Sequence, residues 1–170
     1  TASNNVAVGV DALLKNTTGT YNTAVGSLAL DANQTGSANT AFGYDALSAS
    51  LGDGNTAVGK DALLANTTAS NNVAVGLDAL TANTTGAENV AVGKGALTAN
   101  TTASYNTSVG RHSLYTNTTG EYNVGVGYNA LNLNATTGNN TAVGYTALAA
   151  NVAHNNTAVG YIALDTNTTG

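Results

Sequence analysis

One phrase of about 17 residues is written ten times along this chain. It reads Asn-(Thr/Val)-Ala-Val-Gly-x-x-Ala-Leu-x-x-Asn-Thr-Thr-Gly-x-x, and an invariant glycine marks each copy. The marker residues are Gly9, Gly26, Gly43, Gly59, Gly76, Gly93, Gly110, Gly127, Gly144 and Gly160. They lie 17 residues apart except for two steps of 16, from 43 to 59 and from 144 to 160. A fixed short period over a whole chain predicts stacked coils rather than a globule. We therefore expect one repeat domain of ten coils over residues 1–170.

Composition narrows the classes of function. Only 8% of the residues are charged, and Lys15, Lys60, Lys94 and Arg111 are the only fixed cations, too few for a nucleic-acid footprint. No run approaches the roughly 20 apolar residues that a membrane-spanning helix needs. The chain opens and closes in mid-phrase with no capping repeat, so we expect an uncapped segment of a longer fibre.

The first half of each phrase predicts a short strand, as in Asn5–Gly9. The Val8 position holds Val nine times and Phe once, and we expect it to point into a core. The Ala7 position holds only Ala, Ser or Gly, which suggests a close neighbour on that side. The invariant Gly9 position indicates a positive φ or a close backbone approach at a corner.

The second half of the phrase, Ala12–Asn16, favours one helical turn. Leu13 is Leu in all ten copies and is expected in the core. Asp11 and its equivalents would cap the start of the turn, and Asn16 would end it in the left-handed conformation. A second strand over Ala12–Lys15 remains an open alternative, because a single helical turn is weak by propensity alone.

Asparagine occupies the Asn5 position in every copy. Stacked coils place identical amides about 4.8 Å apart, where they can form an asparagine ladder, and ten coils give a rod roughly 48 Å long. Representative residues expected to carry the structure are Asn5, Ala7, Val8, Gly9, Leu13, Asn22, Gly26, Leu30, Asn72, Gly76, Leu80, Asn140, Gly144 and Leu148.

No residues stand out as catalytic, cofactor-binding or metal-binding, and no cofactor is expected. His112 and His154 occupy different positions of the repeat, so they do not stack. Asp45, Asp61 and Asp78 share one position on adjacent coils and could bridge Ca²⁺, although capping explains each of them alone. Four tyrosines share the position after the corner glycine and could stack on sugars or on a neighbouring fibre. They are Tyr44, Tyr128, Tyr145 and Tyr161.

The run Asn-Thr-Ala-Val-Gly-Tyr-x-Ala-Leu-x-x-Asn-Thr-Thr-Gly, as in Asn140–Leu148 or Asn156–Gly170, resembles the repeats of bacteriophage tail fibres and of bacterial surface fibres that end in an intramolecular chaperone domain. It is also similar to the head repeats of trimeric autotransporter adhesins, which are shorter and lack the Ala-Leu turn. The resemblance covers all ten copies. It implies a trimeric, extracellular fibre with a rigid-spacer or adhesive role.

We thus expect a mainly β, parallel β-solenoid or β-roll, with one strand and one helical turn per coil. A single coil buries little apolar area for its length, which favours a parallel homo-oligomer; the resemblance points to a trimer. The expected function is the non-enzymatic shaft or head of an extracellular fibre, with any glycan or host-surface contact at a tip outside this segment. One alternative is an ice-binding solenoid, with a threonine row of Thr17, Thr67, Thr84, Thr101 and Thr118. The other is a self-assembling filament whose subunits join end to end or through the tyrosines.

Overall fold

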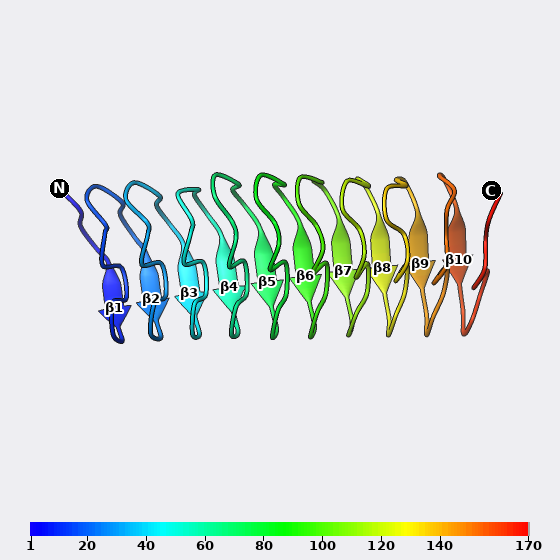
Figure 1. Ribbon diagram of the computed structural model, residues 1–170, viewed down its shortest axis with the longest axis horizontal. Helices are drawn as coiled ribbons and strands as arrows, with labels where there is room; N and C mark the ends of the chain where they lie inside the picture. The colour runs from blue at the N-terminus through cyan, green and yellow to red at the C-terminus, as the bar shows by residue number, and fades with distance from the viewer. Residues whose placement is uncertain (170) are drawn as a thin grey trace.

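The computed structural model describes residues 1–169 as one stack of coils, each of which contributes a three-residue strand (Figure 1). The strands are β1 (Val6–Val8), β2 (Thr23–Val25), β3 (Thr40–Phe42), β4 (Thr56–Val58), β5 (Val73–Val75), β6 (Val90–Val92), β7 (Thr107–Val109), β8 (Val124–Val126), β9 (Thr141–Val143) and β10 (Thr157–Val159). They lie side by side along the long axis, with the two termini at opposite ends (Figure 1). Coils are numbered here by their strand, and repeat positions are named by the residue of the first coil.

All ten strands form a single parallel sheet in sequence order. Each strand pairs with the next so that equivalent positions are neighbours, as in Ala7 with Ala24. This register continues through both 16-residue coils, where Thr40 pairs with Thr56 and Thr141 with Thr157. The missing residue is taken from the turn that precedes the next strand, so the short coils trim a turn and leave the sheet unbroken. The predicted parallel β-solenoid is confirmed.

The predicted helical turn is wrong, because residues 9–16 form a chain of tight turns instead. The backbone amides of Ala12, Leu14 and Asn16 each bond to the carbonyl three residues earlier. Between them, Leu13 N donates to Ala29 O of the next coil at 3.0 Å. Positive φ angles at alternate residues, 58° at Asp11 and 55° at Leu13, make a right-handed helix impossible.

Burial of the leucine side chain offsets the free-energy cost of its left-handed backbone conformation. A left-handed conformation costs an L-residue roughly 1–2 kcal/mol. Burying a leucine side chain stabilises the fold by about 1.5–3 kcal/mol. Leu30 and Leu80 are 0% exposed. The invariant Leu13 position is therefore set by the core, against the local preference of the backbone.

The core contains the Ala7, Ala12 and Leu13 positions, whereas the Val8 position lies outside it. The prediction that Val8 points inward is wrong: Val8 is 58% exposed, while Ala24 and Ala74 at the Ala7 position are 0% exposed. Ala7 itself, in the first coil, is exposed. Strand residues alternate between faces, and the leucine from the turn fills the interior, so only a small residue fits opposite it. The Ala7 position is thus small because of its own coil rather than because of a neighbouring chain.

Two features require glycine at the corners: a positive φ angle and the close approach of the backbone of the next coil. Gly9, Gly26, Gly76 and Gly144 have φ angles of 137°, 134°, 138° and 139°. A Cβ added at Gly76 would lie 2.6 Å from the carbonyl oxygen of Gly93 in the next coil. A side chain at this corner would therefore separate the coils.

Two departures from the core alanines compensate for each other. Ser113 stands at the Ala12 position of coil 7, and its Oγ donates to Gly125 O at 2.9 Å. Gly125 stands at the Ala7 position of coil 8, where a Cβ would lie 2.6 Å from Ser113 Oγ and 3.4 Å from Leu114 Cγ. The added hydroxyl thus fills the volume that the missing methyl group leaves.

Candidate functional surface

The surface that runs the length of the molecule is the outward side of the sheet, called here the outer sheet face. It comprises Val6, Val8, Thr23, Val25, Thr40, Phe42, Thr56, Val58, Val73, Val75, Val90, Val92, Thr107, Val109, Val124, Val126, Thr141, Val143, Thr157 and Val159. None of these side chains is charged, and the Val8 column is apolar in every coil. Because equivalent positions pair in register, the face consists of two straight columns with a repeat of about 4.8 Å. Every residue in them is β-branched except Phe42.

Asparagines at the Asn5 position link each coil to the next. Asn22 N donates to Asn5 Oδ1 at 2.8 Å, and Asn5 Nδ2 donates to Gly19 O at 2.9 Å. The first of these bonds recurs at every step up to Asn156, with distances of 2.8–3.0 Å. Each side-chain oxygen therefore accepts a hydrogen bond from the backbone of the next coil, as a strand carbonyl would. Asn72 and Asn140 both take part in this column. The expected ladder is present, but it runs mainly from amide to backbone.

A second ladder runs through the Asn16 position, where the sequence predicted helix ends. Here amide bonds directly to amide: Asn83 Nδ2 donates to Asn66 Oδ1 at 3.0 Å, and Asn100 Nδ2 to Asn83 Oδ1 at 2.8 Å. These three side chains are fully buried. The signal in the sequence was asparagine in nine of ten copies, which a helix end does not demand.

This second ladder has one interruption, at Ser50 in the short coil 3. Asn66 Nδ2 still donates to Ser50 Oγ at 3.1 Å. On the other side, the Oδ1 of Asn33 is buried without any hydrogen-bond partner. The shorter serine side chain thus satisfies one neighbour and leaves the other unpaired.

Three of the four candidate tyrosines stack on one another. The rings of Tyr128 and Tyr145 lie 5.2 Å apart, and those of Tyr145 and Tyr161 lie 5.3 Å apart, nearly parallel in both pairs. The Arg111 guanidinium lies 5.8 Å from the ring of Tyr128. Because the ring faces cover each other, this column presents mainly ring edges and hydroxyl groups to solvent. A sugar that stacks on a ring face would have to use the free end of the column at Tyr161, which is 75% exposed.

Tyr44 lies apart from that column. The Lys60 ammonium lies 5.9 Å from its ring, and the neighbouring Asp45 carboxylate raises the pKa of the Tyr44 phenol. A second stack was not expected from the sequence: the rings of Tyr105 and Tyr122 lie 5.0 Å apart and almost parallel. Their spacing of 17 residues was the available signal.

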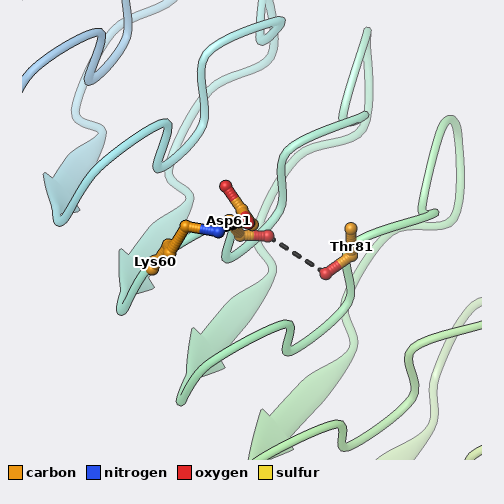
Figure 2. A network of polar contacts seen from close by, with 3 residues as sticks. All are labelled: Lys60, Asp61 and Thr81. Carbon is orange, nitrogen blue, oxygen red and sulfur yellow. Dashed lines mark hydrogen bonds and ion pairs between the residues drawn. The ribbon is translucent and has the colours of Figure 1, made fainter.

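The aspartates at the Asp11 position cap no helix, since none forms there; they occupy a left-handed turn position that Asp tolerates. Lys60 Nζ lies 2.7 Å from Asp61 Oδ2, and Asp61 raises the pKa of the Lys60 ammonium (Figure 2). Thr81 Oγ1 of the next coil donates to Asp61 O at 3.1 Å (Figure 2). Among residues 1–169, no three acidic or imidazole side chains converge as a metal site would require.

The two histidines have separate environments. The His112 ring lies 4.8 Å from that of Tyr115, and its burial, with Arg111 and Lys94 nearby, lowers the pKa of His112. His154 Nδ1 accepts a hydrogen bond of 3.0 Å from Gly138 N in the preceding turn. Each histidine therefore has a local structural contact.

The hydroxyl groups of the threonine row at the Thr17 position each donate a hydrogen bond to the next coil. Thr17 Oγ1 donates to Gln34 O at 2.9 Å, and Thr84 Oγ1 donates to Thr101 O at 2.9 Å. The same contact is made by Thr67, Thr101 and Thr118. These hydroxyl groups therefore hold adjacent turns together, although Thr17 and Thr67 lie at the surface.

The described part of the chain has no cavity or cleft of ligand size, and it contains no helix with the length and apolar character to cross a bilayer. Comparison of the chain with family models, with curated proteins and with solved structures finds no match.

Proposed function

We propose that this chain is a non-enzymatic structural rod, the shaft or head of an extracellular fibre, in which copies associate in parallel through the outer sheet face. The observation that carries the proposal is the unbroken register of ten coils, with one uncharged face running along all of them. A trimer is the assembly that the resemblance to phage and bacterial fibres implies. Attachment to glycans or a host surface is the adhesive role that the same resemblance implies.

Stiffness follows from the number of links between successive coils. Each step joins strand to strand, turn to turn through bonds such as Leu80 N to Ala96 O at 3.0 Å, and two columns of asparagine side chains. Bending the rod would stretch several of these short bonds at once. Nine steps of about 4.8 Å give a rise of roughly 43 Å from the first strand to the last.

The outer sheet face supports association with a second copy. The strands are three residues long, so the face is a strip of roughly 43 by 10 Å. It covers about 430 Å² on each copy, and two such faces bury about 860 Å², close to the ~1,000 Å² expected of a specific interface. The inner core already contains the leucines and alanines, so the valine column adds nothing to it. An apolar residue kept at an outward position in all ten coils is typical of a surface that another chain covers.

Light scattering of the purified protein tests the assembly. We expect a multiple of the monomer mass, and we expect a double variant, Val75→Lys with Val92→Lys, to be monomeric with an unchanged circular dichroism spectrum. Thr68→Lys, in an exposed turn, is the matched control and should leave the mass of the assembly unchanged. A monomer at all concentrations up to about 100 µM would refute the oligomer. Electron micrographs separate discrete rods from the long filaments of the end-to-end alternative.

Ice binding is a second candidate because of one observation: six of the ten Val6 positions are threonine, in a column beside the valines of the same sheet face. The Thr17 row does not favour it, since those hydroxyls are already bonded. A thermal-hysteresis measurement on the monomeric lysine variant and on the unmodified chain decides the matter. Hysteresis that is present in the unmodified chain and lost in the variant would favour ice binding, and none in either excludes it.

A further inference from the structure

We infer that Phe42 fixes the axial register between copies of this chain; the inference rests on the parallel association proposed above. Some distinct residue is needed to set this register because the outer sheet face is nearly uniform. A neighbouring copy shifted by one coil would meet almost the same threonines and valines, so most of the face cannot tell one alignment from another. Uniform strands specify register weakly, and a single distinct residue can set it.

Phe42 is the one departure in the Val8 column. Its side chain is 57% exposed, whereas Val25 and Val58 on the adjacent strands are only partly exposed. The strand that carries it is regular: β3 pairs with β2 and β4 without a bulge, so the protrusion comes from the ring alone. None of the aromatic pairs within residues 1–169 includes Phe42.

Copies arranged around an axis parallel to the rod present the same coil at the same height. In that alignment the Phe42 rings of the copies meet, and every other level of the column brings valine to valine. A shift of one coil places each ring against Val25 or Val58 of a neighbour. The ring then overfills two levels that elsewhere hold two valines, and the levels no longer close together. The in-register assembly is the only one in which all large side chains share a level.

Cross-linking measures the register directly, because the chain contains no cysteine of its own. Val92→Cys alone can be joined by oxidation to a disulfide when coils are level, because a disulfide requires Cβ atoms about 3.8 Å apart, less than the ~4.8 Å step between coils. Co-expressed chains carrying Val92→Cys and Val109→Cys, distinguished by a tag, report a shift of one coil by their mixed product. We expect the level product to exceed the shifted one at least tenfold. In a Phe42→Val background we expect this ratio to fall to about three or less, while light scattering still shows an assembly.

A second variant separates register from stability. Phe42→Val combined with Val58→Phe moves the ring by one coil in every copy, so the level alignment is again the only one that matches rings. We expect the tenfold preference to return. Phe42→Val that keeps the preference, or a moved ring that fails to restore it, overturns the inference while the assembly stands. A monomeric unmodified chain overturns both the inference and the proposed association.

Discussion

Replacing Ser50 with Asn completes the second asparagine ladder and is expected to stabilise the protein. The Oδ1 of Asn33 is buried with no partner, and an amide at position 50 would supply the missing donor. The new Nδ2 would also reach Gly52 O, as Asn83 Nδ2 reaches Gly86 O at 2.9 Å in a regular coil. Asn66 would keep an acceptor in place of Ser50 Oγ.

Room for the larger side chain is shown by the other short coil. Coil 9 also lacks one turn residue, yet it holds Asn151 at this position, 1% exposed, with its Nδ2 3.0 Å from Asn134 Oδ1. Satisfying a buried acceptor is worth about 1–3 kcal/mol. For a chain of this size that corresponds to a rise in Tm of roughly 3–9 °C, at about 3 °C per kcal/mol.

Thermal unfolding followed by circular dichroism measures the effect of Ser50→Asn. Asn83→Ser is the reverse control, because it opens the same kind of gap in an intact part of the ladder and should lower the Tm by a similar amount. An unchanged or lower Tm for Ser50→Asn, beside a clear loss for Asn83→Ser, would show that the ladder is not limited by hydrogen bonding at position 50.

Three further changes test the packing and electrostatics of the coils. Ser113→Ala and Gly125→Ala should each destabilise the chain, whereas the double variant restores the usual pair of alanines. A double-mutant cycle measured by urea unfolding should give a favourable coupling free energy of about 1–3 kcal/mol. Additive effects of the two changes would contradict the compensation. At Gly76 φ is 138°, and the carbonyl group of the next coil lies where a Cβ would be placed. Gly76→Ala should therefore lower the free energy of unfolding in urea by about 2–6 kcal/mol and speed hydrogen exchange in the coils on both sides. A loss below about 1 kcal/mol would contradict the close approach. Burial lowers the pKa of His112 below 6.5, so its contribution to stability is complete above pH 6.5 and is lost as the pH falls through the folded pKa. His112→Asn, at a position where coil 8 carries Asn129, should remove that part of the fall in Tm between pH 7 and pH 5, and an identical fall in both proteins would contradict it.

The outward valines are a case in which the sequence pattern and the packing of the core lead to different predictions. Alternation along Val6–Val8 establishes that the two sides of the strand differ, but it does not say which side is inside. The hydrophobic scale favours valine for the interior, yet the interior is already filled by the leucine of the turn. Ala24 fits in the remaining space and Val25 does not, so the larger apolar residue is turned outward.

The period and the invariant residues were enough to predict ten stacked coils, their parallel in-register pairing, the corner glycines and the column of asparagines through Asn5. In a stack with a fixed repeat, equivalent residues must be neighbours, so a linear pattern translates directly into contacts. Only the tertiary structure decided that Leu13 adopts a left-handed conformation, that the turns bond to the next coil instead of forming a helix, and that Asn16 forms a second ladder. Local propensities contain no information on bonds between residues 16 or 17 apart, and it is these bonds, with burial, that outweigh the cost of the unusual backbone.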